Sequence, residues 1–455
     1  MNLNNLKKIH LIGCGGSGVS AVARMMLKLG RQVSGSDLFR SDITDSLQAL
    51  GADIVIGHDV NKLSPKTDLV IYSAAVPPDD QELSQAKKLD LEILSYAEFL
   101  GLLSTGKKTI AVCGTNGKTT TSAMCGKILA ELGLDPTVII GSELKNFQGN
   151  YRAGQSKYFV LEADEYKANM LKIKPWSILL TSIEEDHLDF YQNLSDIIRH
   201  FQLFVDQLPA DGWMFYNADD RNIIKLKLPA RALSCSLRRP ADYWLKCFQK
   251  NPGCYRFTAM HLSENLGQFT VTIPGEYNVL NALLVIALCH KLKLDLNKAR
   301  RAVENFGGLR RRFEVLGPMK QAQDVLVASD YTHHPSAIAK TLQAAKDFYP
   351  NRRLFLVYQP HQHDRTKKLF EQFLTCFVKA DLTILQEIYD VPGRQYAEDK
   401  TVSSKNLVEA INQPNMIYSP DAVASKKLIL NHLKPQDLLL IMGAGDIDRL
   451  ARELV

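Results

Sequence analysis

Short runs of apolar and β-branched residues recur along the chain, separated by polar stretches in which apolar positions follow helical spacing. Each run has the length of a strand, and the helical stretch after it carries the chain back across a sheet, as in parallel α/β proteins. Three such series follow one another. We predict strands at residues 9–12, 53–56 and 68–72 in the first series, 109–112, 158–161, 178–182, 213–216 and 269–273 in the second, and 325–328, 354–358, 382–385 and 438–442 in the third.

The length of the chain sets the number of domains. At 455 residues it exceeds the roughly 250 to 300 residues at which one hydrophobic core stops growing. We therefore expect two or three domains of α/β class, with linkers near residues 104–108 and 314–322. No internal repeat or low-complexity segment interrupts this organisation.

Composition and charge exclude several classes of protein. With 45% hydrophobic and 23% charged residues the chain is of ordinary globular composition, and no apolar run approaches the roughly 20 residues that cross a bilayer. The net charge of +6 comes without a basic tract, so we expect no nucleic-acid partner and no membrane insertion. The eight cysteines form neither paired zinc-binding motifs nor a disulfide pattern. A cytoplasmic location fits this composition.

The strongest chemical signal lies between a predicted strand and a helix at the start of the second series. Its GxxGK[ST] spacing is that of a loop that wraps around phosphate, with a lysine that reaches the terminal phosphates and a hydroxyl for Mg²⁺. The alternative is a glycine turn followed by a capping threonine and an exposed lysine. The predicted ATP-binding loop consists of Gly114, Thr115, Asn116, Gly117, Lys118, Thr119 and Thr120.

An acidic and an imidazole side chain follow two later strands of the same series. Glu162 comes directly after residues 158–161, and His187 follows residues 178–182. Ligands of α/β proteins gather at the carboxyl ends of strands, and these groups can hold a divalent ion there. Each also has a structural alternative, a solvated loop carboxylate or a hydrogen-bonded structural histidine.

The first series opens with a second glycine-rich turn. Gly13, Gly15 and Gly18 match G-x-G-x-x-G, and Asp37 follows 19 residues after Gly18, at the end of a second predicted strand. This arrangement places a pyrophosphate on a helix N-terminus and a carboxylate near a ribose. Because only about 100 residues precede the next phosphate loop, we expect one nucleoside diphosphate rather than a dinucleotide.

The third series carries polar residues directly after two of its strands. Residues 330–335 read DYTHHP, and residues 359–366 read QPHQHDRT. Arg365 can clamp a carboxylate or phosphate through its planar fork, although an exposed arginine without a ligand is common. Neighbouring histidines normally point to opposite sides of the chain. Residues 443–447 form either a turn into the last helix or a rim of the site.

Taken in order, these motifs resemble the Mur ligase family over almost the whole chain. They include GTNGKTTT at residues 114–121, EADE at 162–165, EEDHLD at 184–189, PGEYNVLNA at 274–282 and RRF at 311–313, besides DYTHHP and GAGDI. The resemblance is strongest to the members that add L-alanine to UDP-N-acetylmuramate. It implies a Rossmann-like UDP-sugar domain at residues 1–105, a central P-loop ATPase domain at 106–315, and a Rossmann-like C-terminal domain at 316–455.

The resemblance also implies roles for individual residues, with ATP and Mg²⁺ as cofactors and a monomer or weak homodimer as the assembly. Besides the phosphate loop, the adenosine side of ATP would contact Asn278, Asn281 and Arg312. The catalytic residues would be Lys118, His187, His334 and Arg365, and the metal ligands Thr119, Glu162 and His187. The UDP-sugar would contact Gly13, Gly15, Gly16, Ser17, Gly18, Asp37 and Ser73.

Some positions depart from the alanine-adding branch. Residue 116 is Asn where that branch has His, Tyr277 replaces a His, and Gln362 replaces an Arg that bears on the choice of amino acid. No lysine occurs between Lys174 and Lys225, so the carbamylated lysine of several relatives has no counterpart, as in the alanine-adding branch.

The reaction that the family implies begins with phosphorylation of a carboxylate by ATP and ends with attack of an amine on the acyl phosphate. Three other functions fit parts of the sequence. A ligase of the same fold would attach a recycled murein tripeptide, and a nicotinamide oxidoreductase would use residues 13–18. A nucleotide sensor would bind without turnover.

Overall fold

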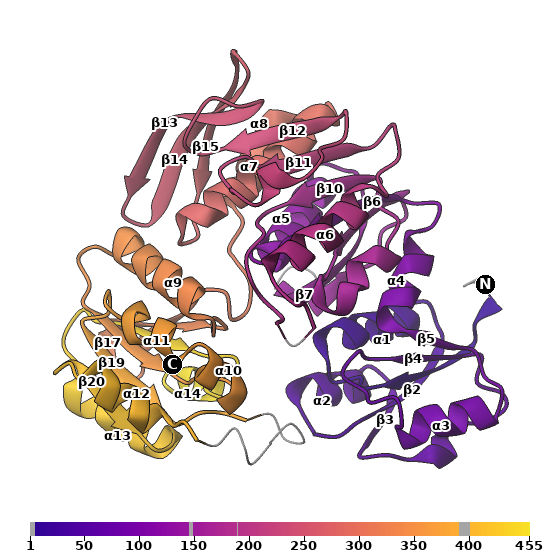
Figure 1. Cartoon of the computed structure of the whole chain (residues 1–455), viewed down its shortest axis with the longest axis horizontal. Coiled ribbons are helices and arrows are strands. Elements are labelled where there is room, and N and C mark those ends of the chain that lie inside the picture. Colours follow the sequence, from indigo (N-terminus) through magenta and orange to yellow (C-terminus); the bar gives the residue numbers. More distant parts are fainter. Residues whose placement is uncertain (1–4, 145–148, 189, 391–400) are drawn as a thin grey trace. The chain divides into compact units, whose positions relative to one another are not determined.

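The structure is a computed structural model that describes residues 5–144, 149–188, 190–390 and 401–455. Its strands form three sheets (Figure 1), which confirms the predicted α/β class. The chain divides into two compact units. The first contains Met1–Lys246, Thr258–Gln268 and Leu280–Val303, and the second contains Cys247–Phe257, Phe269–Val279 and Glu304–Val455.

The first sheet is parallel and has five strands in the order β3-β2-β1-β4-β5. The order reverses between β1 and β4, and ligands of open α/β sheets bind at such a switch point. The strands are β1 (Lys8–Ile12), β2 (Gln32–Asp37), β3 (Asp53–Ile56), β4 (Leu69–Tyr72) and β5 (Ile93–Ser95). The helices are α1 (Ser17–Lys28), α2 (Asp42–Ala49), α3 (Gln81–Lys88) and α4 (Tyr96–Ser104), with a 3₁₀ turn, η2, at Val60–Lys62.

The second sheet has ten strands in the order β15-β14-β13-β12-β11-β10-β6-β9-β7-β8. Its central strands β6 (Lys108–Cys113), β9 (Tyr158–Glu162) and β10 (Ser177–Leu180) are parallel and almost wholly buried, as expected of strands covered on both faces. The other strands are β7 (Thr137–Leu144), β8 (Gly149–Arg152), β11 (Trp213–Asn217), β12 (Ala232–Ser236), β13 (Tyr243–Asn251), β14 (Cys254–His261) and β15 (Glu264–Val271).

The helices of this part of the chain begin with α5 (Lys118–Glu131), which follows the predicted phosphate loop directly. Met124, Ile128 and Leu129 are all fully buried in this helix. The remaining helical elements are α6 (Leu194–Val205), α7 (Glu276–Lys291), α8 (Leu296–Glu304) and the 3₁₀ segments η4 (Tyr166–Lys172) and η5 (Ile223–Lys225).

The third sheet has six strands in the order β16-β17-β21-β18-β19-β20, and only the β16–β17 pair is antiparallel. Its strands are β16 (Glu314–Met319), β17 (Ala322–Asp330), β18 (Leu354–Tyr358), β19 (Leu382–Gln386), β20 (Met416–Ser419) and β21 (Leu438–Met442). Its helices are α9 (Pro335–Phe348), α10 (His363–Lys368), α11 (Phe370–Cys376), α12 (Ser404–Ile411), α13 (Ala422–His432) and α14 (Asp448–Glu453).

One predicted linker is a strand in the structure. Residues 314–322, which contain Gly317 and Pro318, form β16 and its turn into β17. Proline is tolerated on an edge strand, and the ladder shifts register on either side of this pair, so the prediction of a linker was wrong. The other predicted linker, residues 104–108, spans the end of α4 and the start of β6. The residue boundaries of the three domains stay predictions.

Candidate active site

The phosphate loop connects the buried end of β6 to the first turn of α5. Gly114 and Gly117 have φ angles of 132° and 86°, a conformation that side chains with a Cβ rarely adopt. A Cβ at Gly117 would also lie 3.0 Å from Oδ1 of Asn281. The predicted ATP contact Asn281 therefore lies against the loop, and both glycines are required by the backbone and by its neighbours.

The segment after β10 supports the loop from the other side. The Thr115 N–H donates to the Ser182 carbonyl at 2.8 Å, and the Asn116 N–H donates to the Ser182 hydroxyl at 2.9 Å. The Asn116 side chain donates to Oε2 of Glu184 at 3.2 Å. Because these two N–H groups are engaged, the N-terminus of α5, where Lys118 and Thr119 lie, is the part of the loop better suited to a phosphate.

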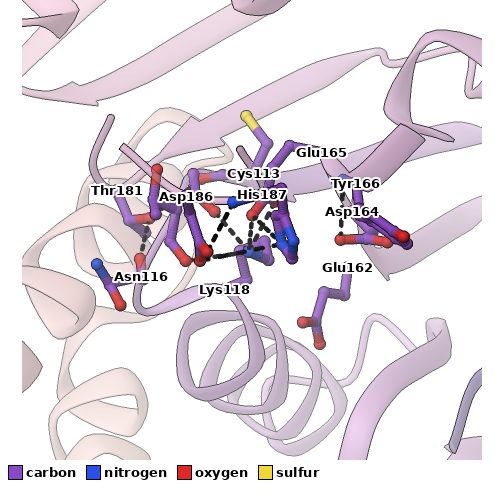
Figure 2. Close-up of polar contacts among 12 residues, drawn as sticks. Cys113, Asn116, Lys118, Glu162, Asp164, Glu165, Tyr166, Thr181, Asp186 and His187 are labelled. Atoms are coloured by element: carbon purple, nitrogen blue, oxygen red, sulfur yellow. Dashed lines mark hydrogen bonds and ion pairs between the residues drawn. The ribbon is translucent and has the colours of Figure 1, made fainter. Parts of the chain in front are cut away.

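Lys118 is the centre of the polar contacts that Figure 2 shows. Its Nζ donates to the carbonyls of Gly114 at 2.7 Å and Thr115 at 3.1 Å, and to Oε1 of Glu165 at 2.9 Å. Burial by itself lowers the pKa of Lys118, but the carboxylate of Glu165 and its acidic neighbours reverse the effect and raise the pKa above its ordinary value. Lys118, which is 12% exposed, is therefore a largely buried cation of the loop.

Glu165 is the acidic partner that the sequence did not single out. It is 3% exposed, and burial raises its pKa to about 7 against the opposing charge of Lys118. Its Oε2 lies 2.7 Å from the Lys118 ammonium but has no hydrogen-bond partner of suitable geometry among the described residues. A buried carboxylate oxygen in this state fits a site that receives a further cation.

His187 and Asp164 complete a cluster with Glu165. Nε2 of His187 lies 3.6 Å from Oε1 of Glu165, and one ligand atom from each of the three residues lies within 4.8 Å of the others. Two carboxylates and an imidazole are a donor set that a divalent cation accepts. The predicted metal ligand His187 thus lies in a group that fits a metal ion.

His187 is held in place by its backbone and by an aromatic neighbour. Its φ angle of 53° is unusual for a residue with a side chain, and its N–H donates to Oδ1 of Asp186 at 2.8 Å. The ring lies 4.7 Å from that of Tyr166, centroid to centroid. A strained backbone that survives at such a position is typical of a functional site.

The other two predicted metal ligands form a separate pair. The Thr119 hydroxyl donates to Oε1 of Glu162 at 2.9 Å, and the Gly141 N–H donates to Oε2 of the same carboxylate at 2.8 Å. Figure 2 shows Glu162 apart from the contacts of Lys118. The structure therefore brings Thr119 to Glu162, and His187 to Glu165 rather than to Glu162.

The glycine-rich turn after β1 lies at the switch point of the first sheet. Gly13 has φ of 76°, and a Cβ there would lie 2.9 Å from that of Ser73, the residue after β4. A Cβ at Gly18 would meet the ring of Tyr96 at 2.8 Å. The predicted UDP-sugar residues Gly13, Gly15, Gly16, Ser17, Gly18 and Ser73 therefore surround one switch point.

Asp37, at the end of β2, holds this turn. Its Oδ2 accepts from the Gly15 N–H at 2.8 Å, and its Oδ1 accepts from the Phe39 N–H at 3.2 Å. The sequence predicted a carboxylate near a ribose, whereas both oxygens contact backbone N–H groups in the structure. Asp37 fixes the shape of the turn in this arrangement.

The remaining predicted residues belong to the second unit. The guanidinium of Arg312 lies 5.3 Å from the ring centre of Tyr331. His334 is the residue before α9, and its Nδ1 lies 2.9 Å from the Ser336 hydroxyl. Arg365 lies in the short helix α10. Asn278 donates from its amide to the Pro274 carbonyl at 2.7 Å at the start of α7.

Arg311 is a basic residue of the same unit to which the sequence assigned no role. Its guanidinium donates to the carbonyls of Gly443 at 2.7 Å and Gly445 at 2.9 Å, which joins the RRF motif to the GAGDI motif. In the sequence, only the place of Arg311 in the RRF motif indicated that it has a role.

Comparison with known proteins covers nearly the whole chain. Residues 8–108 match the Mur ligase family catalytic domain, residues 112–289 the Mur ligase middle domain, and residues 311–445 the Mur ligase glutamate ligase domain. A UDP-N-acetylmuramate--L-alanine ligase of Desulforamulus reducens is 38% identical over 99% of this chain and 97% of its own. The chain belongs to the Mur ligase family.

Other relatives of this Mur ligase agree in length and architecture. The UDP-N-acetylmuramate--L-alanine ligase of Clostridium tetani is 40% identical over 98% of this chain and 97% of its own. The solved UDP-N-acetylmuramate-alanine ligase of Thermotoga maritima matches with a TM-score of 0.84 at 27% identity, and a murein peptide ligase of Psychrobacter arcticus with 0.73 at 25%, each over 98% of both chains. Among the described residues of the Mur ligase, no helix combines the length and apolar character needed to cross a membrane.

Proposed function

We propose that this Mur ligase is an ADP-forming UDP-N-acetylmuramate--L-alanine ligase that acts in the synthesis of peptidoglycan precursors. Full-length relatives that carry this name support the assignment, and so does the higher similarity to the solved alanine ligase than to the solved murein peptide ligase. One feature of this chain supports the proposed phosphoryl transfer. Lys118 lies buried at the N-terminus of α5 among two carboxylates and an imidazole that fit a divalent cation.

The reaction transfers the terminal phosphoryl group of ATP to a carboxylate oxygen of UDP-N-acetylmuramate, and ADP leaves. The amino nitrogen of L-alanine then attacks the acyl carbon, phosphate leaves, and an amide bond forms. Lys118 would exchange its contact with Glu165 for the terminal phosphate and spread the charge that builds there during transfer. The N–H groups at the start of α5 would bind the same phosphates.

Mg²⁺ is the cation that we assign to the site. Thr119 and Glu162 would hold it on one side of the phosphate loop, and His187 with Glu165 and Asp164 would hold a second ion. When bound, Mg²⁺ neutralises the negative charge of the phosphates. The hydrogen bond that the His187 backbone N–H donates to Asp186 and the contact of Tyr166 with the His187 ring would keep that ring directed at Glu165.

The first sheet would bind the UDP part of the sugar nucleotide. A glycine-rich turn, held by the hydrogen bond between Asp37 and Gly15, can approach a pyrophosphate closely at the N-terminus of α1. In the second unit, Arg312, His334 and Arg365 would bind phosphate and carboxylate groups of the substrates. We also propose a cytoplasmic location, which the eight free cysteines support, and a monomer or weak homodimer.

The direct test supplies the purified enzyme with ATP, Mg²⁺, UDP-N-acetylmuramate and one amine at a time, and measures ADP and product mass. We expect ADP release that depends on L-alanine, and a product one alanine residue heavier than the sugar nucleotide. Turnover with a murein tripeptide but not with L-alanine would replace the proposal with a recycling ligase. Binding without ADP release from any amine would indicate a nucleotide sensor.

A matched pair of lysine variants tests whether the reaction takes place at the phosphate loop. Lys118→Ala should abolish ADP release, because it removes the buried cation next to the phosphates. Lys172→Ala is the control, since Lys172 is 56% exposed in an ion pair with Glu98. Full activity of Lys118→Ala would refute the assigned site.

A further inference from the structure

A second group of potential metal ligands lies at two strands of the ten-stranded sheet and at α7, in residues that the proposed reaction does not use. His261 ends β14, Glu264 begins β15, and His290 lies in the last turn of α7. Oε2 of Glu264 lies 3.6 Å from Nδ1 of His261 and 3.6 Å from Nε2 of His290. We propose that His261, Glu264 and His290 form a binding site for a divalent transition metal of the zinc class.

The spacing of the three ligand atoms fits one ion. Zinc bonds to histidine nitrogen and carboxylate oxygen are about 2.0 to 2.2 Å long, so neighbouring ligands of a tetrahedral site lie about 3.3 Å apart. The two nitrogen-to-oxygen distances here exceed that value by only a few tenths of an ångström, and all three atoms lie within 4.8 Å of one another. Each imidazole nitrogen would need to approach the carboxylate oxygen by only a few tenths of an ångström.

The supporting residue of the site is Tyr243 in β13. Its hydroxyl lies 2.8 Å from Nδ1 of His290, and its ring lies 4.7 Å from that of His261, centroid to centroid. The hydrogen bond at Nδ1 leaves Nε2 of His290 as the nitrogen that faces Glu264. A fixed partner on the second ring nitrogen is the usual support of a metal-ligating histidine.

The three side chains differ in how deeply they are buried, as expected of a metal site that is open to solvent on one side. The side chains of His261 and His290 are 18% and 22% exposed, whereas Glu264 is 59% exposed. The imidazoles are therefore held by the fold, and the carboxylate closes the site from the solvent side. Water would occupy the fourth position, as in zinc sites with three protein ligands.

The ligands come from a turn between two strands and from a helix, so we expect a bound ion to stabilise the fold. His261 and Glu264 flank one turn between strands, while His290 belongs to the helix that packs nearby. Bound metal would link that turn to the end of α7 and stabilise the folded state by mass action. The donor set differs from that of the phosphate-loop cluster, because it has two imidazoles and one carboxylate.

The test is a titration of the full-length enzyme with Co²⁺ in excess Mg²⁺, followed by competition with Zn²⁺. We expect one Co²⁺ with the strong visible absorption of a four-coordinate site, displaced by Zn²⁺, and a higher Tm with Zn²⁺. The double variant His261→Gln, His290→Gln should lose the absorption and the Tm increase. His432→Gln is the control, since this histidine lies at the end of α13.

The variant Tyr243→Phe tests whether Co²⁺ binds to the oriented ligand set or binds to exposed histidines by chance. It keeps both imidazoles and the carboxylate but removes the hydroxyl that orients His290, so the Co²⁺ affinity should fall about 10- to 100-fold. Ligase turnover of the double variant in Mg²⁺ should persist, which shows that the variant is folded. Unchanged Co²⁺ affinity and absorption in the folded double variant would overturn the proposal.

Discussion

Nζ of Lys118 lies 2.7 Å from Oε2 of Glu165 in an ion pair whose two side chains are 12% and 3% exposed. A buried pair of this kind keeps the lysine charged and directed at the loop before ATP arrives. In the role that we propose for Lys118, Glu165 would compete with the phosphate for the same ammonium. Binding of ATP would then have to provide enough interaction to replace Glu165.

The first prediction concerns the acidic partner of this pair. Glu165→Gln removes the charge that holds Lys118 and one oxygen of the cluster with His187, while it keeps the size of the side chain. We expect kcat to fall at least about tenfold, a change of about 1.4 kcal/mol in the barrier, with a smaller change in the KM for ATP. Steady-state ADP release measures both constants.

Glu131→Gln is the control for this experiment. Glu131 also pairs with a lysine, Lys127, at 2.6 Å, but its side chain is 44% exposed and lies at the far end of α5. Its substitution should leave kcat within about a factor of two, because Glu131 lies at the opposite end of α5 from the phosphate loop. Equal effects of the two substitutions would contradict a special role for Glu165.

The second prediction tests the hydroxyl of the phosphate loop. Thr119→Val keeps the shape of the side chain but removes the group that contacts Glu162. We expect the Mg²⁺ concentration for half-maximal activity to rise about 10- to 100-fold. The measurement is a Mg²⁺ titration of ADP release at saturating ATP.

Thr121→Val is the matched control in the same helix. Thr121 is fully buried, and its hydroxyl has no hydrogen-bond partner among the described residues. Removing that hydroxyl should be neutral or slightly stabilising, with the Mg²⁺ requirement unchanged. A parallel loss of Mg²⁺ affinity in both variants would point to a general disturbance of α5.

The phosphate loop could be predicted because its signal is local. Two glycines with positive φ, a lysine and a threonine follow one another within a few residues between a strand and a helix, so the sequence order is also the spatial order. Glu165 could not be assigned in the same way. Its direction depends on η4, where Lys167 and Ala168 take φ angles of 50° and 56°.

Long-range pairing explains the other differences between prediction and structure. Short strands such as β5 (Ile93–Ser95), and β8, which pairs with β7, depend on neighbours more than on their own periodicity. The separation of the Thr119–Glu162 pair from His187 likewise depends on how loops leave three strands. Strand patterns predict the shared sheet edge but not the direction of each side chain.

The third prediction concerns the turn that we assign to the UDP-sugar. In Gly15→Ala the new Cβ would lie 2.8 Å from Oδ2 of Asp37, so the carboxylate that holds the turn must move. We expect the KM for UDP-N-acetylmuramate to rise about tenfold with little change in the KM for ATP. Gly307→Ala is the control, because a Cβ at Gly307 meets nothing within 4 Å.

The fourth prediction uses His361, which lies between β18 and α10 in the second unit. Burial and the nearby charge of Arg365 lower its pKa from 6.5 to about 4, although Asp390 and Asp364 oppose the shift. The unfolded chain takes up a proton below about pH 6.5, whereas the folded chain does so only below about pH 4. His361 therefore contributes stability above the first value that is lost as the pH falls toward the second.

His361→Gln removes this difference in proton uptake. Between about pH 6.5 and pH 4, the free energy of unfolding of the variant should fall less steeply than that of the unmodified enzyme, by about 2 kcal/mol over the window. Urea unfolding at several pH values measures the slope. Lys379→Gln, at an exposed position of the same unit, should keep the original slope. Identical slopes for His361→Gln and the unmodified enzyme would show that His361 titrates alike in both states.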